Sequence, residues 1–298
     1  MTPLFILLLG IIGIVPAWNN RQVQAYAYIQ PPNYWEVNSF VIHRPRVFDD
    51  RTTRGGPVVQ RAGLTYVQLD VSTDTRKQLV LETSGNRYCT EESACGVGLS
   101  LAAQLRPLSN VSLSLGPGYT YDETRAQYVT AADDPTATAF YGRRYVFADL
   151  VQKELSVNTR LNITFTPALT LEVFAQTLLS SGKYSNYKEF VAPRGLEKRV
   201  FTDVALADGV VTVDPDGATG PAAPIRFGQP DFTFRSLRGN AVLRWEYKPG
   251  STLYFVWTQS RANSQALGDL AFGRDIGRLF DAPAENLFLI KASYWLGW

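Results

Sequence analysis

Two carboxylates, Glu154 and Glu172, are the residues whose type and spacing first suggest chemistry. Each lies on the polar side of an alternating stretch, and only a short turn separates the two stretches. Carboxyl groups held on neighbouring strands can serve as general acid and general base. The polar sides of the strands also carry basic residues, namely Arg160, Arg244 and Lys291. We therefore expect a polar surface of paired charges in preference to a catalytic pair.

A second acidic group falls in what reads as one long connection between strands. Its members are Asp122, Glu123, Asp133 and Asp134. Carboxylates that converged among such loops could perform acid–base work, whereas an Asp-Asp-Pro sequence is also typical of a simple loop tip. An enzyme with its carboxylates at the loop rim is therefore kept as an alternative.

Other chemistry finds little support in the residues. His43 is the single histidine, so a histidine-based metal site or a Ser-His-Asp triad would depend on it alone. Asp214 and Asp216 in VDPDGATG offer oxygen ligands for calcium, but a plain turn is the better interpretation. With 29 basic and 27 acidic residues, the chain has no polybasic arm for nucleic acid. We predict no cofactor, no metal and no nucleic-acid partner.

The two cysteines, Cys89 and Cys95, lie close together in NRYCTEESACG. They are too few and wrongly spaced for a zinc site. We predict a short disulfide-closed loop, which needs an oxidising compartment; two free thiols are the alternative.

The elements that carry these residues read as β-strands. Polar and apolar residues alternate with a period of two over Val151–Phe165, Leu169–Leu178 and Asn240–Tyr247, which is the pattern of strands with one polar and one apolar face. If the polar faces line the lumen of a barrel, its lining includes Glu154, Arg160, Glu172, Gln176, Arg244, Glu246 and Lys291.

Short turns and long polar connections alternate along the chain from Tyr34 onward. This order places all short turns at one rim and all long loops at the other, as in outer-membrane barrels. It predicts about ten strands, with a range of ten to twelve because Gln22–Ile29 could add a strand and break the even count. The short turns are Ser72–Thr75, Arg106–Ser109, Thr166–Ala168 and Lys248–Gly250; the long connections are His43–Arg61, Ser84–Gly96, Asp122–Ala137, Ser180–Pro230 and Arg261–Glu285.

Alternation does not say whether the apolar face points to a core or to lipid. Aromatic residues near strand ends favour lipid, because tyrosine and tryptophan gather at membrane interfaces. The candidates for such a girdle are Trp245, Tyr247, Trp257, Tyr294 and Trp298. The terminal stretch Asn286–Trp298 alternates in the same way and ends on an aromatic. This resembles the last strand of outer-membrane barrels, which the barrel assembly machinery reads.

Three segments divide the chain. The apolar run Leu4–Val15 is too short to cross a bilayer as a helix. It suits a secretory signal peptide or hydrophobic leader over 1–17, or to 27 if a later cleavage site is used, although it lacks a basic start. Residues 18–33 are a linker or a short first strand, and 34–298 form the β-barrel domain.

Several stretches together resemble a family of bacterial outer-membrane proteins. They are DDRTTRGGP (49–57), TATAFYGRRYVFADL (136–150), LNITFTPALTLEVFAQTLLSSGKYSNYKEF (161–190), LRWEYKPGSTLYFVWTQSR (243–261) and LFDAPAENLFLIKASYWLGW (279–298). The resemblance, from about Asn33 to the end, is to the family's C-terminal β-barrel domain of unknown function. In that family a carbohydrate-binding domain of the family-nine type usually comes first and the barrel is longer, so the chain is similar to the C-terminal portion only. The resemblance implies the bacterial outer membrane and no established activity.

Our expectation is an all-β, antiparallel, up-and-down transmembrane β-barrel with short periplasmic turns and long extracellular loops. Its role would be passage of small solutes, glycans among them, or anchoring in outer-membrane lipid, without catalysis of its own. The alternatives are a soluble β-sandwich module that binds carbohydrate and the barrel enzyme with loop-rim carboxylates.

Overall fold

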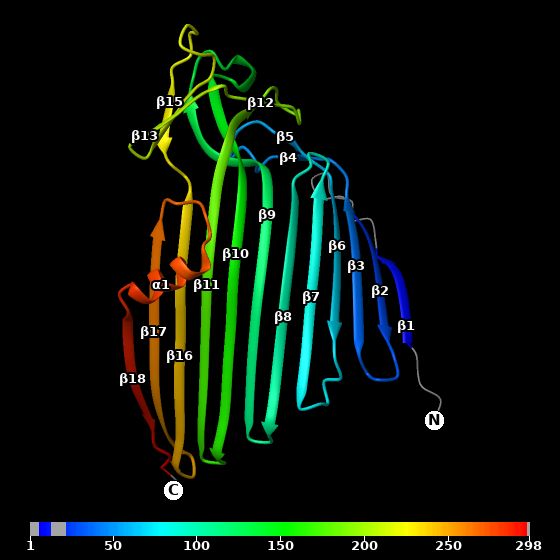
Figure 1. The fold of residues 1–298 in the computed structure, drawn as a ribbon, viewed down its shortest axis with the longest axis vertical. Helices are drawn as coiled ribbons and strands as arrows, with labels where there is room; N and C mark the ends of the chain where they lie inside the picture. Colours follow the sequence, from blue (N-terminus) through cyan, green and yellow to red (C-terminus); the bar gives the residue numbers. More distant parts are fainter. Residues whose placement is uncertain (1–5, 13–21, 297–298) are drawn as a thin grey trace.

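A computed structural model of the chain describes residues 6–12 and 22–296, with side chains from residue 22 onward. The fold is all-β and antiparallel, as the alternation predicted, and is dominated by one large sheet (Figure 1). In spatial order this sheet contains β1 (Ile6–Ile12), β2 (Val23–Gln30), β3 (Glu36–Arg44), β6 (Leu64–Ser72), β7 (Leu79–Thr90), β8 (Cys95–Leu108), β9 (Val111–Asp133), β10 (Arg143–Thr166), β11 (Leu169–Phe190), β16 (Phe232–Lys248), β17 (Ser251–Gln265) and β18 (Glu285–Ser293).

The large sheet is open over the described residues. Strand β1 forms one edge and β18 the other, and each pairs only with its inner neighbour. Strand β2 falls in the stretch that we expected to be a linker or a short strand. Strand β1 falls inside the predicted leader and runs antiparallel to β2. The end of the predicted leader at residue 17 lies outside the described residues.

Short turns lie at one end of the sheet and the longer connections at the other (Figure 1), except that the β7–β8 connection at the latter end is a tight turn of residues 91–94. At the lower end of the view, β10 ends at Thr166 and β11 begins at Leu169, while β16 and β17 are joined by Pro249 and Gly250. Gly250 has φ +75°, a conformation that glycine adopts at little cost. The turns predicted at Thr166–Ala168 and Lys248–Gly250 therefore lie at the same end of the sheet.

The long connections differ from prediction because much of each is strand. The connection predicted at Ser84–Gly96 shrinks to residues 91–94, and β9 continues through most of the one predicted at Asp122–Ala137. Strand β11 likewise extends to Phe190, well into the segment predicted as loop. Other parts of the chain pair with these extensions and pack against them. The polarity of the local sequence does not show such distant contacts.

The extended ends of β9, β10 and β11 form the centre of a folded cap. Around them lie β12 (Lys198–Val200), a three-stranded sheet and a two-stranded sheet. The three-stranded sheet contains β13 (Asp203–Ala207), β14 (Val210–Asp214) and β15 (Ile225–Gly228); the two-stranded sheet contains β4 (Val47–Asp49) and β5 (Val59–Arg61). A short 3-10 helix, η1 (Thr138–Phe140), precedes β10.

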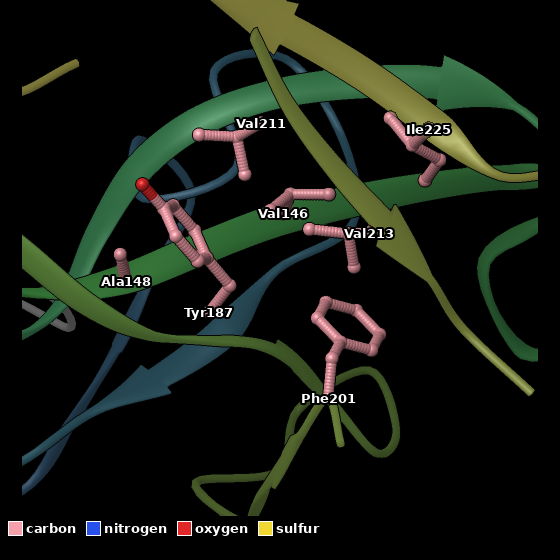
Figure 2. Close-up of a cluster of buried hydrophobic side chains, with 7 residues drawn as sticks. All are labelled: Val146, Ala148, Tyr187, Phe201, Val211, Val213 and Ile225. Atoms are coloured by element: carbon pink, nitrogen blue, oxygen red, sulfur yellow. The ribbon is translucent and has the colours of Figure 1, made fainter. Parts of the chain in front are cut away.

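The cap buries both faces of β10. On one face, Val146 and Ala148 pack with Tyr187 and with side chains of β14 and β15 (Figure 2). On the other, Phe147 packs edge-to-face on Phe190, with ring centroids 5.0 Å apart, in a cluster with Val59. Register shifts within and just after this segment mark β-bulges or irregularities in both neighbouring ladders. Most of the buried apolar side chains therefore lie in the cap, whereas the strands below it form a single layer.

One α-helix, α1 (Phe272–Asp281), interrupts the connection between β17 and β18 and contacts β16 and β17. It falls in the segment predicted as a long polar loop. Figure 1 shows it lying across the upper part of these strands.

Candidate functional site

One face of the large sheet collects the polar residues of the strands from β2 to β17. Below the cap, paired residues on neighbouring strands have numbers of the same parity, as in Glu36 with Ser72 and Glu154 with Ser180. Paired residues point to the same side of a sheet. Even-numbered side chains therefore lie on one face, which we call the polar face. The parity changes at β18, where Lys291 pairs with Tyr254 and so shares the polar face.

The seven residues predicted to line a lumen all lie on this polar face. They come from four strands: Glu154 and Arg160 from β10, Glu172 and Gln176 from β11, Arg244 and Glu246 from β16, and Lys291 from β18. Sequence alternation alone therefore grouped side chains whose strands are far apart in the chain.

The charge pairing on the polar face is sparser than we expected. Arg244 and Glu246 form an ion pair at 3.1 Å, and the guanidinium of Arg160 lies 5.7 Å from the ring centre of Phe174. Glu172 lies opposite Asn162, eight residues along β10 from Glu154. At about 3.3 Å per residue that is roughly 26 Å. The two glutamates therefore do not form an acid–base pair.

The polar face is hollowed in places. A hollow of about 530 Å³ extends over β3, β6, β7, β8, β9 and β10, where Gly116 and Gly118 contribute no side chain. A second hollow, of about 490 Å³, is lined by Arg160, Glu172 and Asn240. Space for water or a small polar solute thus exists beside charged and amide groups.

The opposite face, which we call the apolar face, carries exposed hydrophobic side chains along its strands. Leu101 is 42 % exposed, Leu115 45 % and Phe255 39 %. Large aliphatic and aromatic side chains in one continuous area are unusual on a surface that meets water. The predicted girdle residues Trp245, Tyr247 and Trp257 share this face. Tyr294 follows the end of β18 and lies near Lys248, and Trp298 lies outside the described residues.

The cap contains a buried ion cluster centred on Arg144. Its guanidinium donates to Asp134 at 2.7 Å and to Glu189 at 2.6 Å, and Arg199 pairs with Glu189 from the other side. Burial alone would raise the pKa of Asp134, but hydrogen bonds from Thr136 and Arg144 outweigh it and hold that pKa below its usual range. Asp134 lies in the β9–β10 connection, as predicted, and is a buried carboxylate with a structural role there.

The four loop-rim carboxylates of the enzyme alternative are engaged separately. Glu123 accepts from the Tyr121 hydroxyl and pairs with Arg125 at 3.3 Å, and Asp133 lies on the surface, 3.5 Å from Arg143. Asp122 is hydrogen-bonded to the Tyr88 side chain. These carboxylates do not face one another across a common hollow.

A second buried ion cluster surrounds Asp149, which sequence reasoning did not single out. Asp149 accepts from Lys188 and from the Asn186 amide at 2.8 Å, and Arg125 approaches it at 3.5 Å. Asn186 has φ +49°, a left-handed conformation at the bulge in β11. The bulge thus turns a carboxylate, an amide and an ammonium toward each other inside the cap.

Cys89 and Cys95 form a disulfide at the tight β7–β8 turn. Residues of this turn connect to the rest of the cap: Glu91 pairs with Arg46 at 3.0 Å, and Glu92 pairs with Lys198. These ion pairs hold the crosslinked acidic turn against two basic residues from distant segments.

The third ion cluster fixes helix α1 to the sheet. Arg235 of β16 donates to Asp275 at 2.7 Å, and both side chains are fully buried. Asp275 also accepts the Ala271 backbone N–H at 2.7 Å and lies 2.9 Å from Arg274. Arg235 is odd-numbered, so the helix lies over the apolar side of the sheet, above the exposed hydrophobic residues.

Metal binding and membrane-spanning helices find no support in the part of the chain that the structure describes. No group of three or more potential protein ligands comes together there. Asp214 and Asp216 accept backbone N–H groups of their own turn, from Gly217 at 2.9 Å and Ala222 at 3.1 Å. No described helix is long and apolar enough to cross a membrane.

Comparison with known proteins gives a family without an assigned activity. No curated protein matches the chain, and neither does any solved structure. A family model described as a domain of unknown function (DUF5916) matches residues 20–298, nearly the whole chain. The chain therefore belongs to the DUF5916 family.

Proposed function

We propose that this chain forms the wall of an outer-membrane β-barrel, with its apolar face in lipid and its polar face lining an aqueous lumen. Its role is passage of small polar solutes or anchoring of the cap at the cell surface. The observation that carries the proposal is the exposed, continuous apolar face that contains Leu101, Leu115 and Phe255. In a membrane barrel such side chains meet hydrocarbon instead of water.

Strand length supports the same proposal. A tilted strand needs about 9–11 residues to cross the bilayer. From β3 to β18, the strands of the large sheet have between 9 and 24 residues. The shortest of these can cross, while the excess of β9, β10 and β11 stands in water as the cap.

A spanning sheet must close, because hydrocarbon cannot satisfy the backbone groups of an open edge. The sheet has twelve strands in its path, each antiparallel to the next, so β1 and β18 run in opposite directions. Further pairing at these edges, with each other or with added strands, would complete the barrel.

A soluble carbohydrate-binding sandwich has less support from the fold. A sandwich covers the apolar face of one sheet with that of another. Over the described residues, the apolar face below the cap and α1 has no covering sheet. The barrel enzyme has less support because its carboxylates are engaged separately.

The test is fractionation of the full chain expressed in a bacterium with an outer membrane, followed by gel mobility in detergent with and without heating. We expect the chain in the outer-membrane fraction, with faster migration before heating because a closed barrel resists detergent. A chain that stays soluble, or whose mobility heating does not change, contradicts the proposal.

A further inference from the structure

Helix α1 has a flank that neither the sheet nor the cap covers. Phe272 and Phe280 are 61 % and 57 % exposed, although the helix is firmly attached to the sheet through Asp275 and Leu279, both fully buried. At 3.6 residues per turn, Phe272, Ile276 and Phe280 fall along one stripe. The helix thus has an apolar flank that its contacts with the sheet leave open.

The contacts of the helix fix the direction of this flank. Arg274 and Arg278 fall on the flank opposite the phenylalanines. Arg278 donates to Gln265, the last residue of β17 at the cap end, and Arg274 pairs with Asp269 beyond it at 2.9 Å. The basic flank therefore faces the cap, and the apolar flank faces down the strands.

The apolar face of the sheet begins below the helix, on the same strands. The Arg261 side chain of β17 donates to the carbonyls of Phe280 and Ala282, at the end of the helix. Trp257 lies four residues from Arg261 along the same strand, toward the turn end. Trp257 is 41 % exposed and stacks on Phe288 of β18, with ring centroids 6.4 Å apart. On this side of β17, the residues that the helix covers, such as Arg261, are polar, whereas Trp257, nearer the turn end of the strand, is apolar. The exposed phenylalanines lie at the boundary between the two.

We infer that α1 is an interfacial helix that rests on the outer surface of the lipid bilayer. Phe272, Ile276 and Phe280 enter the boundary of the hydrocarbon, while Arg274 and Arg278 lie among the polar headgroups. This arrangement is that of amphipathic helices lying in the plane of a membrane interface. The lipid surface is the occupant that fits, because the flank continues the apolar face of the strands. This inference rests on the proposed barrel and adds the position of the outer bilayer surface along the strands.

The test is spin-label accessibility in the full chain reconstituted in phospholipid vesicles. A nitroxide is attached to Phe280→Cys, with Gly277→Cys as the matched control on the outward side of the same helix. A side chain at Gly277 meets no atom within 4 Å, so the control label is tolerated. A third label at Leu101→Cys reports whether the apolar face itself is in lipid. The native cysteines are joined to each other.

We expect the Phe280 label to collide several-fold more with oxygen, which concentrates in lipid, than with a water-soluble nickel chelate, and the Gly277 label to show the reverse. Phe272→Cys repeats the measurement if Phe280→Cys does not fold. A Leu101 label in lipid with a Phe280 label in water overturns the inference and leaves the barrel intact. A Leu101 label in water overturns both. Protection of the Phe280 label from both reagents indicates a protein contact and overturns the lipid assignment.

Discussion

Arg235 and Asp275 form an ion pair in which neither side chain is accessible to water, and it joins a strand of the large sheet to the helix that precedes β18. Asn263 of β17 also accepts from Arg235, at 3.2 Å. Burying two charges is costly, and hydrogen bonds on both partners are what offset the loss of hydration. The pair therefore specifies where α1 lies more than it adds net stability.

The variant Asp275→Ala should release the helix, because it leaves the buried Arg235 charge without its counter-ion. Removing one member of a buried pair costs about 3–5 kcal/mol. We expect backbone amides of residues 270–281 to lose protection in hydrogen exchange, with the strands unchanged. The matched control is Asp269→Asn. The native Asp269 side chain is 61 % exposed and pairs with Arg274 at the surface. Equal protection in both variants would contradict this role for Asp275.

The apolar face can be tested by a single pair of neighbouring positions in β8. Leu101→Arg places a charge on the apolar face, which costs about 2–4 kcal/mol at the middle of a bilayer. Ser100→Arg places the same charge on the polar face, where hydration persists. We expect the first variant to lower the yield of the detergent-resistant form and the second to leave it unchanged. Similar yields for the two variants would argue against lipid on the Leu101 side.

The cap should loosen in acid while the strands below it persist. The pKa of Asp134 is lowered in the folded chain, since Thr136 and Arg144 outweigh the opposing effect of burial. A carboxylate with a lowered folded pKa contributes stability above its unfolded pKa of about 3.9, and this stability is lost as pH falls through the folded value.

Pepsin, which cleaves in acid, measures this loosening. We expect cleavage within residues 191–231 to appear as the pH falls below the unfolded pKa of about 3.9, toward the lower pKa at which folded Asp134 takes up a proton. Asp134→Asn serves as control: its amide cannot gain a proton, so its cap should be cut at higher pH as well. Cleavage of the native cap that does not change with acidity would exclude Asp134 as the titrating group.

The disulfide offers a test of compartment and of the cap together. The exported chain should take up no alkylating reagent before reduction and two equivalents after it, because both cysteines are joined. Mass spectrometry reads the difference directly. The double variant Cys89→Ser, Cys95→Ser removes the closure of this small loop and should lower the free energy of unfolding by about 2 kcal/mol. Free thiols on the exported chain would contradict the assignment.

Much of the fold was predictable because the side-chain direction of a strand is local. Period-two alternation assigned Glu154 and Arg160 to one face, and the register places Glu172, Gln176 and Lys291 on that same face. The turns at Thr166–Ala168 and Lys248–Gly250 were readable for the same reason, since proline and glycine set backbone angles within a few residues.

The cap and the helix were decided by tertiary structure. Val146 and Phe147 are adjacent in β10, and both are fully buried because different segments cover the two faces of the strand. Nor could the sequence show that Asp134 meets Glu189 through Arg144, or that Asp275 meets Arg235, because partners 40 or more residues apart leave no local pattern.

The sequence by itself thus determined the strands and the two faces that they present, since alternation and turn residues act over a few positions. Only the tertiary structure decided which loops continue as strands, which carboxylates are buried with arginine, and where α1 lies over the apolar face. These depend on desolvated charges and packed side chains brought together from distant segments.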